Sequence, residues 1–323
     1  MRRVSGPVAI VAAVFLAPPP AGPRAQEQRP TFRAGVTAVA VDVSVRVRNN
    51  PVPGLGPRDF ELTDHGVPQR IDSVSIEPIP LDVSILLDVS GSSYGWVRQL
   101  EQNAAELAAI LTPADRFRVI CFGLEVREVV PMQAPGEVVR LGSIPYAGGT
   151  SLYDALFHGI VHDSGPDRRH LIVTFTDGSD TTSVLSADQV VDAATRSDAS
   201  VHMVQLRANS GNPPLIPLWS DSGVGRPVPE ELERIVEATG GRVHIPIRPF
   251  RPSLPEEMRE VLADYRTRYV LRFVPAGVSP DGWHSLTVTV PRQPRARIEA
   301  RRGYFAGPPR QPKEMRPKPG PRP

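Results

Sequence analysis

The sequence has one cysteine in 323 residues, and its leading apolar stretch is too short to cross a membrane. Cys121 cannot form an internal disulfide, and its place in the apolar run 119–122 is typical of a small buried side chain. The stretch at residues 8–17 covers ten residues, about half of what a bilayer requires. Glycine-rich fingerprints for nucleoside triphosphates or dinucleotides are also absent. The sequence therefore gives no support to a disulfide scaffold or to a nucleotide-binding enzyme.

Charge of either sign is modest, with a formal net charge of +2. Three arginines before residue 26 contribute +3 and residues 306–323 contribute +4, so residues 26–305 carry a net charge of −5. A mildly acidic body with a short basic tail argues against nucleic acid as the main partner. We expect residues 306–323, which are rich in proline and basic residues, to be a disordered tail.

The first 25 residues have the features of an export signal. Arg2 and Arg3 precede the apolar stretch 8–17, and three prolines follow it at 18–20. This order predicts a signal peptide at 1–25 and an exported chain, periplasmic or extracellular, with no membrane span after cleavage. The alternative is an uncleaved N-terminal anchor.

Residues 80–265 alternate strand-like and helix-like patterns, which predicts a mostly parallel sheet covered by helices on both faces. Short connections between 116–122 and 126–131 require one antiparallel pair. Ser186 is a candidate helix N-cap and Gly240 a candidate helix end. Expected strands are 82–88, 116–122, 126–131, 170–176, 200–206 and 242–247, and expected helices are 96–111, 152–163, 186–198, 229–239 and 254–266.

Two β-rich segments flank this block, at 26–79 and 266–305. Residues 36–48 alternate apolar and polar side chains, as a half-buried strand does. Further short strands are expected at 60–62, 71–76, 269–274, 286–290 and 297–300.

Three short stretches far apart in sequence contain oxygen-bearing side chains. Residues 88–92 (DVSGS) follow one apolar run, residues 176–178 (TDG) follow another, and residues 148–150 (GGT) precede a helical pattern. Strand ends of a parallel sheet meet at one edge, so the loops can converge there. Carboxylates and hydroxyls without His or Cys favour Mg²⁺, Mn²⁺ or Ca²⁺ over zinc. The candidate ligands are Asp88, Ser90, Ser92, Thr150 and Asp177.

This ordered triple resembles the metal-ion-dependent adhesion site of von Willebrand factor A domains, whose pattern is D-x-S-x-S, then Thr, then Asp. The resemblance covers residues 80–265 and implies a Rossmann-like, doubly wound sheet with one antiparallel edge strand. Residues 301–305 (RRGYF), just before the expected tail, resemble the end of secreted bacterial proteins related to this family. Because the ends of an A domain lie close together, the two flanking β segments are expected to pair.

The resemblance also implies a function and a division of roles. Ser90, Ser92 and Thr150 would contact the cation, while Asp88 and Asp177 act through water and hydrogen bonds. An Asp or Glu of a partner protein would then complete the coordination shell. This predicts a metal-dependent protein-binding module that is not an enzyme. A structural alternative is an envelope scaffold whose metal only stabilises the fold.

A serine hydrolase is the sharpest chemical rival. Residues 91–95 (GSSYG) match the G-x-S-x-G pattern around Ser93, and Asp177, Asp180 and His244 follow in the order that a triad requires. Against it, Ser93 lies five residues beyond Asp88 rather than on the turn itself, and the sequence marks no oxyanion hole. Asp180 is otherwise expected to be a turn residue.

Two further groups have simpler explanations than function. His158 and His162 have a spacing used for zinc, but no third ligand accompanies them. They are expected to be surface or packed helix residues. The basic cluster Arg168, Arg169 and His170 is expected to be a solvated loop.

Overall fold

Six strands with largely apolar sequences pair into one central sheet in the computed structural model. It describes residues 38–90, 95–144, 148–162, 164–165, 167–205, 228–246 and 253–307, without the side chains of 95–97. The sheet order is β11-β10-β9-β6-β7-β8, and only β7 and β8 pair antiparallel. The strands are β6 (Leu81–Asp88), β7 (Arg116–Phe122), β8 (Val126–Gln133), β9 (Arg169–Thr176), β10 (Ser200–Gln205) and β11 (Val243–His244).

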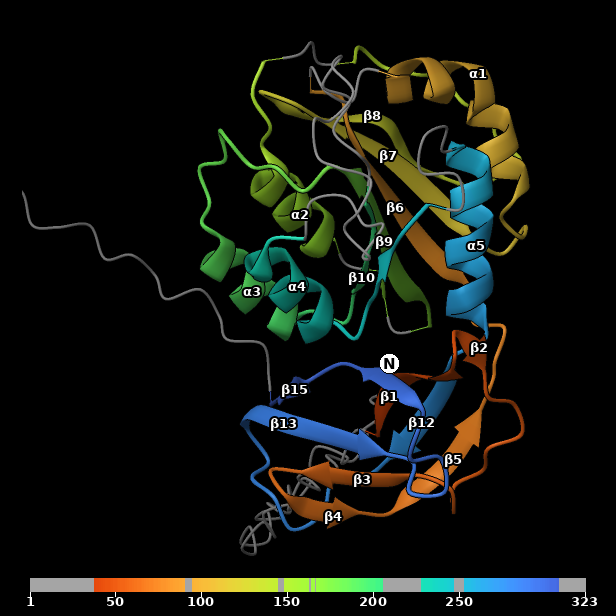
Figure 1. The fold of residues 1–323 in the computed structure, drawn as a ribbon, viewed down its shortest axis with the longest axis vertical. Helices are drawn as coiled ribbons and strands as arrows, with labels where there is room; N and C mark the ends of the chain where they lie inside the picture. Colours follow the sequence, from red (N-terminus) through yellow and green to blue (C-terminus); the bar gives the residue numbers. More distant parts are fainter. Residues whose placement is uncertain are drawn as a thin grey trace, which may run out of the picture. The chain divides into compact units, whose positions relative to one another are not determined.

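Helices cover both faces of this sheet (Figure 1). Helices α1 (Gly95–Ala109) and α5 (Leu254–Arg266) share one hydrophobic cluster with the strands, and α2 (Leu152–Ile160), α3 (Ala187–Arg196) and α4 (Glu230–Ala238) share another. Burial of two apolar strand faces and five apolar helix faces is the main stabilising contribution. The predicted α/β class is confirmed, and the doubly wound arrangement is confirmed in part, because the sheet is mixed rather than wholly parallel.

Local signals set two of the helix ends. Ser186 caps α3 in a capping box, where its side chain accepts from the Gln189 amide and the Gln189 side chain accepts from the Ser186 amide. This satisfies two amide groups that a helix N-terminus leaves without partners. After α4, Gly240 takes a φ of +69°, the left-handed conformation that glycine adopts without strain. Both predicted boundary residues are confirmed.

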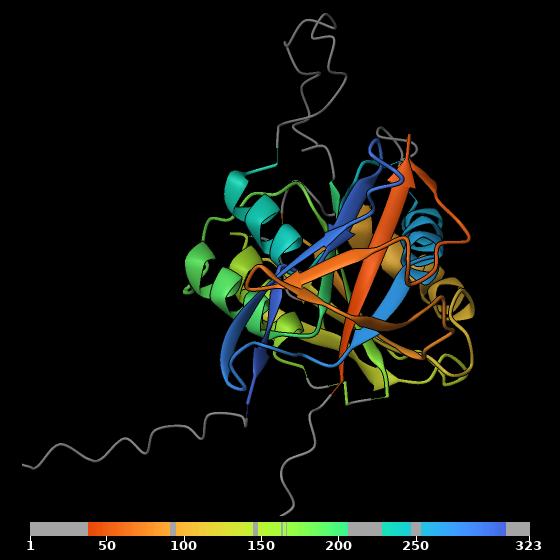
Figure 2. The ribbon, with the colours of Figure 1, turned by 90° about the horizontal axis from the view of Figure 1, so that it is seen from below.

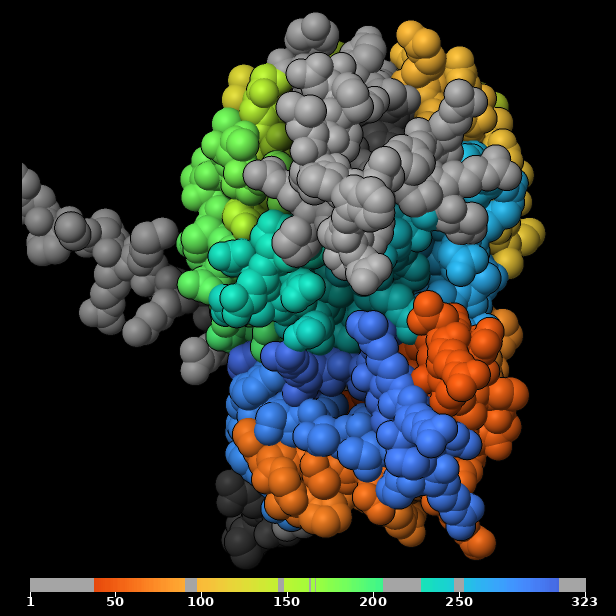
Figure 3. Space-filling model, viewed as in Figure 1, coloured from red at the N-terminus to blue at the C-terminus, as the bar shows by residue number. Residues whose placement is uncertain are grey.

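The two flanking β segments pair with each other, as expected. A five-stranded sheet has the order β14-β1-β12-β5 with β2 beside β1, and a four-stranded sheet has the order β15-β13-β3-β4. Orange strands from before the central sheet lie beside blue strands from after it (Figure 2), and orange and blue residues adjoin in the space-filling view (Figure 3). The strands are β1 (Val39–Val47), β2 (Asn50–Pro51), β3 (Glu61–Asp64), β4 (Val67–Gln69), β5 (Ile71–Ser75), β12 (Tyr269–Phe273), β13 (Gly282–Thr289), β14 (Arg297–Ala300) and β15 (Gly303–Ala306).

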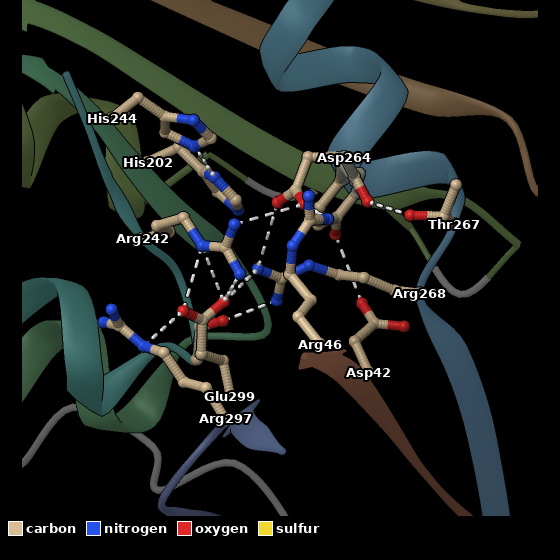
Figure 4. A network of polar contacts seen from close by, with 12 residues as sticks. Asp42, Arg46, His202, Arg242, His244, Asp264, Thr267, Arg268, Arg297 and Glu299 are labelled. Carbon is tan, nitrogen blue, oxygen red and sulfur yellow. Dashed lines mark hydrogen bonds and ion pairs between the residues drawn. The ribbon is translucent and has the colours of Figure 1, made fainter. Parts of the chain in front are cut away.

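A buried ionic network joins α5 and the turn before β11 to strands β1 and β14 (Figure 4). Asp264 pairs with Arg46 and Arg242, and Glu299 accepts hydrogen bonds from Arg242 at 2.9 and 3.1 Å. Arg268 is 1% exposed and lies 3.5 Å from Glu299. Removing one partner of such a network leaves uncompensated buried charge, so each member depends on the others.

The prediction of a solvated loop at residues 168–170 is wrong. Arg169 and His170 begin β9, and His170 is buried with its ring 3.0 Å from the Ser84 hydroxyl. Arg168 donates to Asp82 at 2.5 Å, and Arg169 pairs with Asp42. Charged residues at a strand start can be buried when each one meets a carboxylate, which the sequence pattern did not reveal.

The predicted signal peptide, 1–25, and residues 308–323 of the predicted tail lie outside the described residues, while β15 extends to Ala306. Among the helices that the structure describes, none has the length and apolar character needed to cross a membrane. All described residues belong to one compact unit.

Candidate metal centre

The two predicted carboxylate ligands lie at or just after the ends of two neighbouring strands, at one edge of the central sheet. β6 ends at Asp88 and β9 ends at Thr176, and these parallel strands pair in register up to Leu87 and Phe175. The Thr176 hydroxyl donates to Asp88 Oδ2 at 2.9 Å. Asp177 follows directly, so the two predicted carboxylate ligands approach each other because their strands are adjacent.

The Ser90 backbone folds back toward the same carboxylate. Its amide and its hydroxyl donate to Asp88 Oδ1 at 2.9 and 2.5 Å. This is the turn that a short acidic side chain forms with the residue two positions later. Both Asp88 oxygens therefore accept hydrogen bonds, and the Ser90 hydroxyl is held beside the carboxylate.

Asp88 is fully buried, and its surroundings are unfavourable for an isolated negative charge. Burial raises the pKa of Asp88, hydrogen bonds from Ser90 and Thr176 oppose this, and the charge of Asp177 raises the pKa further; the net direction is upward. A cation would stabilise the ionised form of a buried carboxylate that lies beside a second carboxylate. The site therefore has the electrostatics of a cation-binding centre before any ion is considered.

Thr150 is held against the third loop by its main chain. Its amide donates to the Thr181 hydroxyl at 2.8 Å, and its carbonyl accepts from the amides of Thr181 and Thr182 at 2.9 and 3.2 Å. Thr150 is 6% exposed. The loop that carries Thr150 and the loop that begins with Asp177 are thus hydrogen-bonded as one unit.

Asp180 closes this unit by capping a helix from another loop. Helix α2 has no cap from its own Ser151 side chain. Instead, Asp180 Oδ1 accepts from the amides of Leu152 and Tyr153 at 2.8 and 3.2 Å, and from the Ser183 hydroxyl at 2.5 Å. A carboxylate at a helix N-terminus satisfies free amides and interacts favourably with the helix dipole.

Asp154 returns the contact in the opposite direction. Its two oxygens accept from the amides of Val184 and Leu185, each at 2.9 Å. The first turn of α2 and the loop after β9 are therefore joined reciprocally, because one carboxylate from each accepts from two amides of the other. This arrangement fixes the Thr150 backbone relative to the Asp177 loop.

Two glycines in the motif are required by this close approach. A Cβ atom on Gly149 would lie 2.2 Å from Thr182 Cγ2, so any side chain there would push the two loops apart. Gly178 has a φ of +86° while its amide donates to the Thr176 hydroxyl at 3.1 Å. Glycine is the residue that accepts this conformation without strain.

The structure brings together most of the predicted ligands. Asp88, Ser90 and Asp177 lie at one edge, and Thr150 is joined to the Asp177 loop through Thr181. Ser92 lies outside the described residues. Binding of a metal by these five residues stays a prediction.

Four residues hold the ligands in place; sequence reasoning named Thr176 and Asp180 without these contacts and missed Asp154 and Thr181. Thr176, Asp154, Asp180 and Thr181 supply the bonds between loops, and Asp180 is a helix cap rather than only a turn residue. The sequence contained no signal for this cap, because Ser151, a favoured N-cap residue, precedes α2 and only the structure shows that its side chain does not cap the helix. The partner could not be read, since it lies 28 residues away.

The donor set fits a hard divalent cation. The neighbouring groups are carboxylate and hydroxyl oxygens, and the described parts of the three loops contain no His or Cys. Such oxygen ligands suit Mg²⁺, Mn²⁺ or Ca²⁺, with Asp88 and Asp177 supplying the negative charge.

Two of the candidate triad residues for a hydrolase have other partners. His244 is buried and hydrogen-bonded to His202 at 2.8 Å, and burial lowers the pKa of His244 to about 4. Asp180 is committed to the first turn of α2. Ser93 lies outside the described residues, so its reactivity is untested.

The sequence matches no protein-family model and no curated protein. Solved structures similar to the chain include a von Willebrand factor type A protein from Catenulispora acidiphila, with 16% identity, TM-score 0.45, and coverage of 85% of this chain and 65% of that one. BatB from Bacteroides thetaiotaomicron has 16% identity, TM-score 0.38, and coverage of 57% and 98%. Proximal thread matrix protein 1 from the mussel byssus, with a zinc-occupied metal-ion-dependent adhesion motif, has 13% identity, TM-score 0.41, and coverage of 62% and 49%.

These TM-scores are all below one half. The sheet of this chain carries one antiparallel edge strand after the first crossover, and the motif loops 88–90 and 176–178 meet at the ends of neighbouring strands. The loop at 148–150 is bonded to the second of these. In these respects the chain resembles the von Willebrand factor A domains.

Proposed function

We propose that this chain is an exported module that binds a protein partner through a divalent cation, Mg²⁺ or otherwise Mn²⁺ or Ca²⁺. The observation that carries the proposal is the fully buried Asp88 carboxylate, whose pKa is raised by burial and by Asp177. No ion pair with Asp88 occurs among the residues that the structure describes. A cation would relieve this arrangement, and the oxygen donors around it suit a hard ion.

The chemistry assigned to the bound cation is the capture of a carboxylate. Ser90, Ser92 and Thr150 would offer neutral hydroxyls to it, and Asp88 and Asp177 would balance its charge. With so few anionic ligands, the ion retains attraction for an Asp or Glu from a partner. That attraction is stronger where the partner surface excludes water. The proposal includes no catalytic step, in agreement with the occupied roles of Asp180 and His244.

The proposal is tested by capture of partners from the envelope fraction of the source cells, with Mg²⁺ or with EDTA. Wild type, Asp177→Ala and Asp192→Ala are compared, because Asp192 is an exposed helix carboxylate paired with Arg196. We expect a partner that is retained by wild type and by Asp192→Ala with Mg²⁺, and lost with EDTA or in Asp177→Ala. Equal retention by Asp177→Ala would contradict the proposal.

The scaffold alternative is separated by the same experiment combined with thermal unfolding. A metal that stabilises the chain while no partner depends on it would favour a purely structural ion. Export is tested independently by locating the chain in fractionated cells and by sequencing its mature N-terminus.

A further inference from the structure

A second set of metal-ligand side chains lies in the four-stranded sheet, separate from the oxygen-rich loops. Asp64 ends β3, His65 begins the turn to β4, and His284 lies on β13. One ligand atom from each of these residues lies within 4.8 Å of the others. Strand pairing creates this proximity, since β3 and β13 are antiparallel neighbours and the His65 amide donates to the Ser285 carbonyl at 2.9 Å.

Asp64 and His284 already have nearly the spacing of two ligands on one ion. His284 Nδ1 lies 2.9 and 3.0 Å from the two Asp64 oxygens. Ligands about 2.0–2.2 Å from a tetrahedral zinc ion are about 3.3 Å from each other, so a shift of a few tenths of an ångström suffices. The Tyr304 hydroxyl donates to Asp64 Oδ2 at 2.7 Å, the kind of outer hydrogen bond that orients a ligating carboxylate.

Asp64 and His284 are buried more completely than is usual for ionisable side chains that no strongly charged cation neutralises. Asp64 and His284 are both 0% exposed, and the imidazole is the only basic group in ion-pair contact with Asp64 in the described part of the chain. A buried carboxylate whose only basic partner is one imidazole is costly, and a cation bound between Asp64 and His284 Nδ1 would reduce that cost.

His65 gives the site a third ligand, its second nitrogen donor, and a path to solvent. It is exposed, and it has a φ of +48° in a two-residue hairpin turn with Gly66. Its Nε2 lies 2.7 Å from the Trp283 carbonyl and its Nδ1 lies 3.3 Å from the Ser285 hydroxyl. Binding an ion would exchange one of these two contacts for a metal bond, which an exposed side chain can do by rotation.

A second His/Asp group in the described residues does not compete for this role. His202, His244 and Asp264 also lie within ligand distance of one another. However, Arg46 and Arg242 pair with Asp264 (Figure 4), and the neighbouring guanidinium charges contribute to lowering the pKa of His202 and His244 after burial itself. A cation would meet repulsion there, whereas the described residues place no guanidinium group in an ion pair with Asp64.

We propose that Asp64, His65 and His284 bind a zinc-class transition-metal ion with an open coordination position. Two imidazoles and one carboxylate form a donor set that suits zinc and related ions and is poor for Mg²⁺. The site ties the β3–β4 turn to β13, far in sequence from it. It does not depend on the proposed function of the other site.

The test uses Co²⁺ as a spectroscopic substitute for zinc, in the full chain without a histidine tag. The background variant is Asp177→Ala, with excess Mg²⁺ present, so that oxygen-ligated binding is suppressed. His65→Asn is the probe, because asparagine tolerates a positive φ and the turn is preserved. His158→Asn on α2 is the matched control, since it removes a histidine outside the group.

We expect one equivalent of Co²⁺ with visible absorption bands of a four- or five-coordinate ion, displaced by zinc. His65→Asn should weaken binding at least about tenfold, with unchanged unfolding in EDTA, while His158→Asn binds as the background does. Absence of a Co²⁺ equivalent in the background, or equal binding by His65→Asn, would overturn the proposal. Neither result would affect the Mg²⁺ site, which is absent from the background variant.

Discussion

Replacing Asp180 with alanine removes the cap that holds helix α2 and the Thr150 loop against the Asp177 loop. The carboxylate accepts two amide hydrogen bonds at the helix N-terminus and one from Ser183. Loss of a cap costs about 1 kcal/mol. Loss of the negative charge near the helix dipole, with a second amide left unbonded, adds about 1 kcal/mol. We therefore expect Asp180→Ala to lower the free energy of unfolding by about 2 kcal/mol.

Urea denaturation measures this change directly, and thermal unfolding should show a fall of about 4–8 °C. Asp180→Asn keeps an acceptor oxygen and should lose about half as much. Asp192→Ala is the matched control, because it removes an exposed carboxylate from an i,i+4 pair and should change stability by less than about 0.5 kcal/mol.

The same variant should also weaken metal binding, although Asp180 is not a proposed ligand. Without the cap, Thr150 is no longer fixed relative to Asp177, so part of the binding free energy is spent on ordering the loop. We expect Mn²⁺ to bind about tenfold more weakly, equivalent to about 1.4 kcal/mol by calorimetry. If Asp180→Ala matched Asp192→Ala in both stability and Mn²⁺ affinity, the assignment of Asp180 as a positioning residue would be refuted.

Acidification should destabilise the fold before its carboxylates are protonated, since burial lowers the pKa of His170 to about 3, of His244 to about 4 and of His202 well below its ordinary 6.5. As the pH falls, the unfolded chain binds these protons before the folded chain does. The free energy of unfolding therefore keeps its full value above pH 6.5 and falls toward pH 4, by up to about 2 kcal/mol per histidine at pH 5. Urea midpoints that stay constant from pH 7 to 5 would contradict this. Glu299→Ala leaves two buried guanidinium groups without this partner and should cost about 3–5 kcal/mol in urea unfolding, and a loss below 1 kcal/mol would show that the network is dispensable. Gly149→Ala should cost about 1–3 kcal/mol because its methyl group meets Thr182, and an unchanged melting temperature would disprove the need for glycine there.

Periodic apolar sequence was sufficient to predict most of the elements. The strands expected at 82–88 and 170–176 contain largely apolar runs, and the structure has them at Leu81–Asp88 and Arg169–Thr176. Because parallel neighbours end at one edge, the meeting of Asp88 with the 176–178 loop followed from the pattern alone. Antiparallel pairing at 116–122 followed from the short connection.

Contacts between distant loops were not predictable from local pattern. Asp180 looks like any acidic turn residue until the uncapped N-terminus of α2 lies beside it. Likewise, Arg169 lies in a basic stretch typical of a surface loop, yet it is partly buried at the start of β9, where it pairs with Asp42 of β1. In both cases the deciding partner is supplied by tertiary structure, and a single sequence contains no signal for it.

The most direct test of the central claim is thermal unfolding of the chain in EDTA, Mg²⁺, Mn²⁺ and Ca²⁺, for wild type and Asp88→Asn. Asparagine keeps the size and acceptor oxygen of Asp88 while removing the charge that the cation would balance. We predict a melting shift with millimolar metal in wild type and none in Asp88→Asn, which should be at least as stable as wild type in EDTA because burial disfavours the Asp88 charge. An equal shift in both proteins, or none in wild type, would contradict a metal centre at Asp88.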